Sequence, residues 1–202
     1  MHFSTIFAIA LAGSSKIVQA IIYNQQVADM YDDLGNTGVG PIPLNSNGGI
    51  NYNNFKYVTV NGTLPQLTGV LPQSGRNVAL LLMPAVGSFA ASDRCFVLEQ
   101  FHFGCTTTNV EPAANVPLQC RLSVTAYGAD NGVVGSQEFT FTPNGLLRST
   151  MDPANVSLPP AQLVLVEATI LNLPPNLGSA LTAVLFDDVT YTQYVDSLNC
   201  GF

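Results

Sequence analysis

The run Ala183-Val184-Leu185-Phe186-Asp187-Asp188-Val189-Thr190-Tyr191-Thr192 is the strand around which we expect the fold to be built. Its aliphatic, aromatic and β-branched residues favour extended structure, and an acidic pair interrupts them at the centre. An earlier acidic pair, the first in chain order, lies in Met30-Tyr31-Asp32-Asp33-Leu34. We expect the first and last strands to lie side by side, so that the two acidic pairs meet there.

Further candidate strands precede this run at intervals, separated by Pro, Gly and Asn. They are expected at residues 21–24, 55–60, 77–83, 95–104, 118–127, 133–142, 162–171 and 182–194. Alternation is clear in Glu138-Phe139-Thr140-Phe141-Thr142, and Ala129-Asp130-Asn131-Gly132 reads as a hairpin turn. No stretch keeps a 3.6-residue period over three turns. The pattern predicts an all-β protein, a two-sheet antiparallel sandwich of the jelly-roll type.

Composition indicates an extracellular β protein and argues against nucleic acid as a partner. The 202 residues are 47% hydrophobic, enough to fill the core of one domain. Charged residues make up only 9%, against roughly 25% in average globular proteins. The formal net charge is −7 and no basic run occurs, whereas phosphate binding needs clustered Lys and Arg.

Residues 1–20 are expected to be a secretory signal peptide rather than part of the fold. An apolar segment from Phe3 to Gly13 is followed by a polar stretch and the small residue Ala20, after which we expect cleavage. The alternative is an N-terminal membrane anchor, although a span needs about 20 apolar residues. No other stretch is long enough to cross a membrane. We therefore expect a secreted protein whose single domain covers residues 21–202.

Four cysteines lie beyond this leader, and an even number implies disulfides in a secreted chain. Of the three possible pairings, we expect Cys105–Cys120, across a loop between neighbouring strands, and Cys95–Cys200, at the C-terminal tail. The spacing does not fit a zinc site, because the chain has no C-x-x-C and only two histidines.

Two sequons provide candidate sites for N-glycans. They are Asn61-Gly62-Thr63 and Asn155-Val156-Ser157. Both lie beside turn residues, as expected for surface acceptors. We therefore expect Asn61 and Asn155 to be glycosylated in a secreted protein.

A long loop follows the first acidic pair and ends in the candidate ligand-binding residues. Residues 35–54 are rich in Gly, Pro and Asn, and loops of this length are often functional. Lectin sites combine an aromatic face that stacks on a sugar ring with amides that bind its hydroxyls. Asn51, Tyr52, Asn54 and Tyr57 supply both elements. In the alternative, Tyr52 is a core residue that folds the loop down, and the Asn side chains satisfy turn backbone.

Several blocks of the sequence resemble a group of secreted fungal proteins of uncharacterised function. They are Asp32-Asp33-Leu34, Gly40-Pro41-Ile42-Pro43, Gly48-Gly49-Ile50-Asn51-Tyr52-Asn53-Asn54-Phe55, Phe101-His102-Phe103-Gly104-Cys105, Cys120-Arg121-Leu122-Ser123-Val124-Thr125-Ala126-Tyr127-Gly128 and Leu185-Phe186-Asp187-Asp188-Val189-Thr190-Tyr191. The resemblance implies a galactose-binding-like jelly roll, the fold of many carbohydrate-binding modules. Tyr52 departs from the group's pattern, which has Trp there, and this chain has no Trp.

The resemblance also implies a structural calcium ion where the first and last strands meet. In such jelly rolls the first Asp of the final pair is the usual ligand. This role carries onto Asp187, with Asp32 or Asp33 as its companion. The residues themselves agree, because a carboxylate among apolar neighbours is costly unless paired or metal-bound, and Lys and Arg are scarce here. In the alternative, the acidic pairs cap turns or accept backbone N–H groups without a metal.

No catalytic constellation stands out in the sequence. His102 has no nucleophile near it, and no spacing selects a glycosidase pair from Glu99, Glu138 and Glu167. Nucleophile elbows, phosphate-binding loops and redox motifs are lacking. We therefore expect a secreted, non-catalytic protein that binds a glycan or cell-wall polysaccharide, or acts at the cell surface. The alternatives are a structural or host-interacting protein that binds no sugar, and a carbohydrate-active hydrolase.

Overall fold

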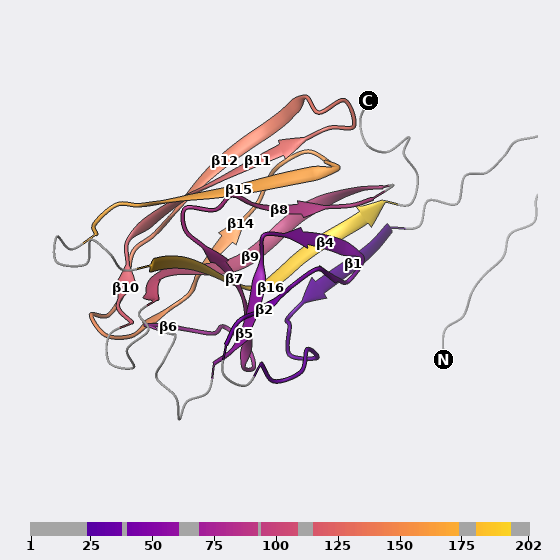
Figure 1. Ribbon diagram of the computed structural model, residues 1–202. Helices are drawn as coiled ribbons and strands as arrows, with labels where there is room; N and C mark the ends of the chain where they lie inside the picture. Colours follow the sequence, from indigo (N-terminus) through magenta and orange to yellow (C-terminus); the bar gives the residue numbers. More distant parts are fainter. Residues whose placement is uncertain are drawn as a thin grey trace, which may run out of the picture.

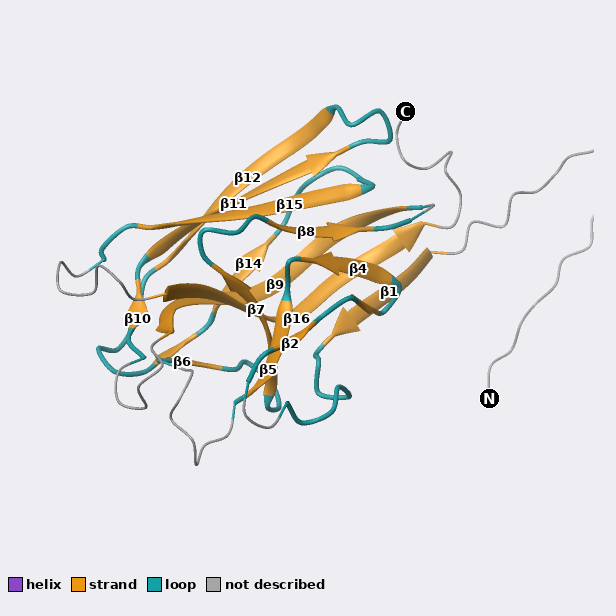
Figure 2. Cartoon of the chain, viewed as in Figure 1, coloured by secondary structure: helices purple, strands orange, loops and turns teal. Residues whose placement is uncertain are grey.

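The computed structural model describes residues 24–37, 40–60, 69–92, 94–108, 115–173 and 181–194. In these ranges the chain consists of strands and loops, and the strands form two facing sheets and one small further pair (Figures 1 and 2). The predicted all-β sandwich is therefore confirmed. None of the described residues belongs to a helix that could cross a membrane.

The larger sheet has eight strands in the order β10-β9-β16-β7-β5-β2, with β1 paired to β16 and β14 paired to β9. Its strands are β1 Asn24–Asp29, β2 Ile42–Pro43, β5 Lys56–Thr59, β7 Asn77–Leu82, β9 Cys95–Thr108, β10 Pro117–Leu118, β14 Asp152–Asn155 and β16 Leu181–Tyr194. The second sheet has the order β12-β11-β15-β8-β4-β3. Its strands are β3 Ser46–Asn47, β4 Ile50–Asn53, β8 Gly87–Ala90, β11 Cys120–Tyr127, β12 Val133–Phe141 and β15 Leu163–Ile170. A short parallel pair joins β6 Val70–Leu71 to β13 Ser149–Thr150.

Strand β16 organises the larger sheet. It pairs with β9 along nearly its whole length. On its other edge, residues 183–186 pair with β7 and residues 189–194 pair with β1. The first and last strands of the described chain therefore lie side by side, as predicted. Asp187 and Asp188 occupy the gap between the two partners, where the register with β9 shifts and Asp188 has a φ of 48°.

Aromatic side chains from both sheets meet in one buried core. Phe186 of β16 lies 5.6 Å from Phe101 of β9 and 6.3 Å from Phe89 of β8, measured between ring centroids. Phe55, just before β5, lies 5.4 Å from Phe186 and 5.1 Å from Phe89. Aromatic pairs in this range stabilise a fold beyond the area that they bury. Phe186 therefore connects the last strand to the opposite sheet.

Seven of the eight expected strands are present, with ends that differ by up to four residues. The first expected strand falls mostly on residues outside the described ranges, and β1 begins at Asn24. Three strands of four residues were not expected: β4, β8 and β14. Strand β8 contains Gly and Ser, β14 contains Pro153, and β4 contains two Asn, so each lacks the composition typical of a strand.

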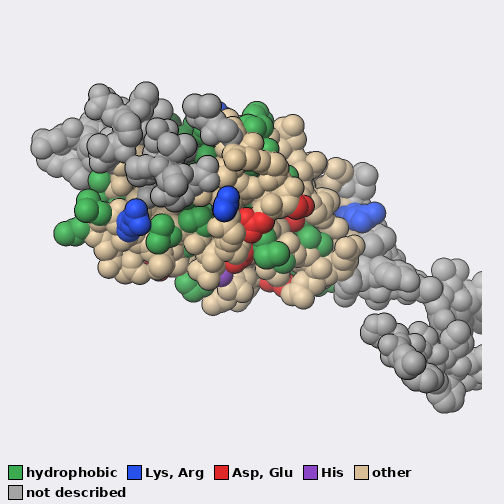
Figure 3. Space-filling view, turned by 90° about the horizontal axis from the view of Figure 1, so that it is seen from below, with side chains coloured by type: hydrophobic (Ala, Val, Ile, Leu, Met, Phe, Trp, Pro, Cys, Tyr) green, Lys and Arg blue, Asp and Glu red, His purple; other side chains and the backbone are tan. Residues whose placement is uncertain are grey.

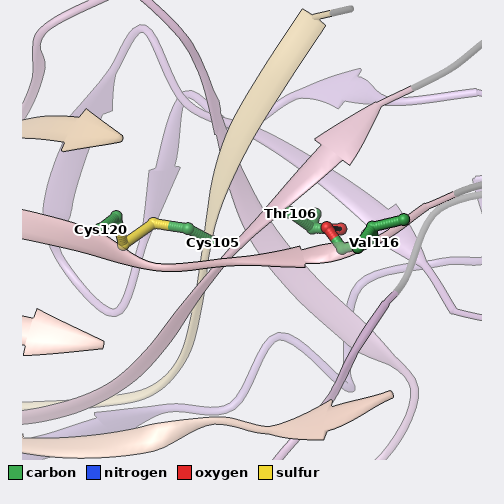
Figure 4. The surroundings of a disulfide bond; sticks show 4 residues. All are labelled: Cys105, Thr106, Val116 and Cys120. Carbon is green, nitrogen blue, oxygen red and sulfur yellow. Dashed lines mark hydrogen bonds between the residues drawn. A yellow bond between two sulfur atoms is a disulfide. The ribbon is translucent and has the colours of Figure 1, made fainter. Parts of the chain in front are cut away.

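The predicted disulfide between Cys105 and Cys120 is present, with a Cα–Cα distance of 6.2 Å (Figure 4). Cys105 lies in β9 and Cys120 in β11, so the bond joins the two sheets rather than two neighbouring strands. Next to it, the Thr106 hydroxyl donates a hydrogen bond of 3.2 Å to the Val116 carbonyl. The disulfide therefore fixes the two layers at the end of β9.

Some of the other residues named from the sequence lie outside the described ranges. Cys95 is buried at the start of β9, whereas its predicted partner Cys200 is not described. The Cys95–Cys200 pairing therefore stays a prediction. Asn155 is exposed at the end of β14, and Asn61 is not described. Residues 1–20, the predicted signal peptide, are likewise outside the described ranges.

Replacing both Cys105 and Cys120 with alanine is expected to lower the free energy of unfolding by about 3 kcal/mol, because the bond closes a loop and so restricts the unfolded chain. The sequence separation is 15 residues. Urea denaturation of the double variant beside the wild type measures the change. A loss below about 1 kcal/mol would show that the bond contributes little to stability.

Candidate functional site

A surface hollow of about 750 Å³ lies beside the loop that the sequence singles out. Strand β4, the residues that flank β4, and the β7–β8 turn form its walls. Its polar lining consists of Asn45, Asn51, Asn53, Asn54 and Lys56, and apolar side chains supply much of the rest. No Asp or Glu is among the described residues that line it. We call this feature the asparagine hollow.

The alternation of β4 directs its amides to the hollow. Ile50 and Tyr52 are buried in the core, whereas Asn51 and Asn53 are exposed on the opposite face. The turn before β4 contains Gly48 and Gly49, both with positive φ. A Cβ atom on Gly48 would lie 2.1 Å from the Tyr191 hydroxyl. Glycine therefore allows the turn to rest directly on β16.

Hydrogen bonds hold the amides of the asparagine hollow in place. Asn53 donates from Nδ2 to the Ser88 hydroxyl at 2.9 Å, and Asn54 donates from Nδ2 to the Val86 carbonyl at 2.8 Å. Asn51 donates in the same way to a serine hydroxyl after β8, at 3.2 Å. In all three bonds the asparagine donates from its side-chain N–H group, and among the described residues no hydrogen bond is made to the side-chain oxygens. Each amide thus keeps its oxygen as an acceptor.

Tyr52 belongs to the core, as in the alternative interpretation of the sequence. Its side chain is 2% exposed, and its ring lies 5.3 Å from Phe89 and 5.7 Å from Phe55. The ring is therefore not available to stack on a sugar. Tyr57 is half-buried and does not line the hollow. Of the four predicted ligand-binding residues, Asn51 and Asn54 present amides to the hollow.

Asn45, Asn53 and Lys56 also line the hollow, although they are not among the four ligand-binding residues predicted from the sequence. A signal for Asn53 was present, because strict alternation from Ile50 puts Asn51 and Asn53 on one face. Recognising β4 as a strand rather than as the end of a loop would have identified this face. Lys56 is placed by the pairing of β5 with β2, and Asn45 lies just before β3, which pairs with β4; the sequence shows neither pairing.

A buried carboxylate beneath the hollow was also missed. Asp29 of β1 is 4% exposed, and it accepts hydrogen bonds from the hydroxyls of Tyr52 and Tyr191, the second at 3.1 Å. Burial raises the pKa of Asp29 above its usual value, although the tyrosine hydrogen bonds act in the opposite direction. Asp29 therefore links β1, β4 and β16 under the asparagine hollow.

The two acidic pairs bind the same turn before β7. Asp187 accepts hydrogen bonds of 2.9 Å from the backbone N–H groups of Gln73 and Ser74, and another from that of Asp188. Asp32 accepts from the N–H groups of residues 76 and 77, at 2.8 and 3.3 Å. Burial raises the pKa of Asp187 to about 7, and the charge of Asp188 adds to the rise. Both acidic pairs therefore accept hydrogen bonds from the backbone of residues 73–77.

This geometry matches the alternative in which the carboxylates accept backbone N–H groups. Ca²⁺ takes six to eight oxygen ligands, whereas the turn offers N–H donors to Asp187. Within the described ranges, no cluster of three or more His, Cys, Asp or Glu side chains could hold a metal. Asp33 is exposed. The calcium site at Asp32, Asp33 and Asp187 stays a prediction from the sequence.

His102 lies close to the second acidic pair without forming a catalytic arrangement. Its Nδ1 atom is 3.9 Å from Oδ2 of Asp188, and the Ser74 hydroxyl donates to Oδ1 of Asp188 at 2.6 Å. The carboxylate thus lies between serine and imidazole. A catalytic triad needs the imidazole in the middle, next to the nucleophile. This cluster does not activate Ser74.

Comparison with known proteins shows the fold alone. No protein-family model matches the sequence, and no curated protein matches it. The structure of a DUF4465 family protein from Bacteroides caccae is similar, with a TM-score of 0.56 and 10% identity over 83% of this chain and 98% of that chain. A carbohydrate-binding module of family 61 in complex with β-1,4-galactotriose matches with a TM-score of only 0.27 and 9% identity, over 72% of this chain and 81% of that chain. The second likeness is too weak to support an argument.

Proposed function

We propose that this protein is a non-catalytic carbohydrate-binding protein and that the asparagine hollow is its site. The observation that carries the proposal is the set of fixed amides with open oxygens around a partly apolar floor. Sugars present hydroxyls, which donate and accept, and C–H faces, which pack on apolar side chains. The volume of about 750 Å³ is within the range of small-ligand pockets and accommodates one to a few sugar units.

The amides of Asn51, Asn53 and Asn54 would supply most of the specificity. Each amide can accept from one hydroxyl and donate to another, and its own hydrogen bond to the protein limits its rotation. A preorganised group loses less entropy when a ligand binds. Because Tyr52 is buried, no ring of β4 stacks on the sugar, and hydrogen bonds must provide much of the affinity.

The lining of the hollow favours binding over hydrolysis. Glycosidases use two carboxyl groups on either side of the scissile bond, about 5 to 10 Å apart. The described residues that line the hollow include four Asn and one Lys but no Asp or Glu. They therefore provide neither a general acid nor a nucleophile for glycoside cleavage.

We also propose that the protein acts outside the cell, as the predicted signal peptide implies. The disulfide between Cys105 and Cys120 supports this proposal, since such bonds persist in oxidising compartments. Asn155 is exposed and would accept a glycan in a eukaryotic secretory pathway.

A glycan array with the protein, followed by calorimetry on the best ligand, tests the proposed site. Replacing Asn51 and Asn53 together with alanine is expected to lower affinity at least about fivefold, since each lost hydrogen bond contributes about 0.5–1.5 kcal/mol. Asn155→Ala, outside the hollow, is the matched control and is expected to bind like the wild type. Protein made without glycosylation keeps this comparison clean.

Two results would contradict the proposal. If the double variant binds its glycan as tightly as the wild type, the site lies elsewhere on the molecule. If the array stays blank with and without Ca²⁺, the alternative of a structural or protein-binding role is favoured. In that case the search moves to protein partners.

A further inference from the structure

Exposed leucines gather at one end of the molecule. Leu146 and Leu147, in the loop between β12 and β13, are 90% and 77% exposed. Leu171 and Leu173, after β15, are 39% and 43% exposed, and Leu71 of β6 is 38% exposed. We call these five side chains the leucine end. Most apolar residues of this size are buried in a soluble domain, and clustered exposed ones mark an interaction site.

The loops that carry these leucines are neighbours in space. Gln119 connects two of them, because its carbonyl accepts from the N–H of Leu171 and its side chain donates to Thr142 at 3.5 Å. Leu71 pairs with Thr150, just beyond the Leu146 loop. Figure 3 shows hydrophobic side chains at the left end of the molecule beside a Lys or Arg, while the acidic side chains lie nearer the middle.

The Leu146 loop is held in one conformation by its base. The Ser149 hydroxyl donates to Oδ1 of Asn144 at 2.9 Å, and Nδ2 of Asn144 donates to the Thr150 hydroxyl at 2.7 Å. A Cβ atom on Gly145 would lie 2.2 Å from the Arg148 carbonyl oxygen, so this close turn needs glycine. The two leucines are therefore presented at the tip of a fixed turn rather than on a loose segment.

The leucine end carries positive charge in an acidic protein. Arg148 follows Leu147 directly, is exposed, and forms no ion pair within the described part of the chain. Arg121, next to Gln119, is 4.0 Å from Glu138. Residues 142–150 and 171–173 contain no Asp or Glu, although the net charge of the chain is −7. Arg148 therefore gives these two segments a positive formal charge, opposite in sign to the net charge of the chain.

We propose that the leucine end docks on a phospholipid surface with anionic headgroups, where Leu146 and Leu147 insert between the headgroups and Arg148 contacts phosphate. A projecting tip suits a fluid surface, which can deform around it, whereas a protein partner would need a matching pocket. A second copy of the chain would offer the same Arg148 at its own leucine end and no complementary negative charge there. Interfacial binding of this kind combines apolar insertion with attraction to anionic lipid.

Vesicle co-sedimentation tests this inference. The probes are vesicles of phosphatidylcholine alone and of phosphatidylcholine with one fifth phosphatidylserine. The wild type is expected to bind the mixed vesicles more strongly, and L146S/L147S is expected to lower the bound fraction at least about fivefold. R148Q is expected to reduce binding to the mixed vesicles only, because the charge attraction depends on anionic lipid.

Val133→Ser is the matched control, because Val133 is 62% exposed in the β11–β12 hairpin at the opposite end of β12. It is expected to bind vesicles like the wild type. Unchanged thermal unfolding shows that each variant is folded. Wild-type protein that stays in the supernatant with both vesicles, or L146S/L147S that binds like the wild type, would overturn the inference. Neither result bears on the asparagine hollow.

Discussion

Replacing Phe186 with alanine is expected to lower the free energy of unfolding by about 3–5 kcal/mol. Phe186 is fully buried and contacts rings from both sheets, including Phe55 and Phe89. Its removal leaves a cavity where β16 faces the second sheet, and the surrounding strands are too constrained to fill it. Denaturation in urea or guanidinium measures the loss.

Leu146→Ala is the control for this variant, because Leu146 is 90% exposed and touches little of the core. Its stability is expected to remain within about 0.5 kcal/mol of the wild type. A similar small change for Phe186→Ala would mean that β16 does not connect the two sheets as described.

Asp187→Ala is expected to destabilise the protein by about 1–3 kcal/mol, because it removes a buried carboxylate that accepts from three partly buried backbone N–H groups. The carboxylate accepts from the backbone of Gln73, Ser74 and Asp188 at the point where β16 changes partners. Asp187→Asn keeps one oxygen and is expected to cost less. Equal stability of Asp187→Ala and the wild type would contradict this role.

The same carboxyl group is expected to make stability depend on pH. Burial raises the pKa of Asp187 to about 7, so the folded protein holds this proton between about pH 4 and pH 7 while the unfolded chain releases it. Stability should therefore fall as pH rises through this window, by up to about 1.4 kcal/mol per pH unit for one group. Asp29, whose pKa is also raised, acts in the same direction.

Thermal unfolding of the wild type and Asp187→Asn between pH 4 and pH 8 isolates this contribution. The wild type is expected to lose more stability than the variant as pH rises, because the variant has no carboxyl group to deprotonate there. Parallel pH profiles for the two proteins would show that Asp187 has an ordinary pKa in the fold.

The sequence predicts the framework well because its strongest signals are local. Strands β11 and β12 alternate and are joined by a turn with Asn131 and Gly132, and both were expected nearly to their ends. The acidic pair of β16 correctly indicated that first and last strands meet. The N–H donors of residues 73–77, which the acidic pairs bind, come from a turn that no local pattern links to β16.

The candidate site was harder to predict, because it depends on pairings between distant segments. The sequence left Tyr52 open between a sugar-stacking ring and a core residue, and its burial follows from the pairing of β4 with β8, a strand that the composition does not reveal. In the sequence Asp29 is an ordinary polar residue near the end of a strand. Only the fold brings the hydroxyls of Tyr52 and Tyr191 to its carboxylate. Fold likeness does not fill this gap, since one fold serves many functions and only the site decides among them.

The central claim, that the asparagine hollow binds a sugar, is tested most directly by NMR. The side-chain amide resonances of Asn51, Asn53 and Asn54 are followed while the best ligand from the array is added. We expect these resonances to shift first and to saturate together, with those of Asn155 unchanged. Shifts confined to other parts of the surface, or none at saturating ligand, would contradict the claim.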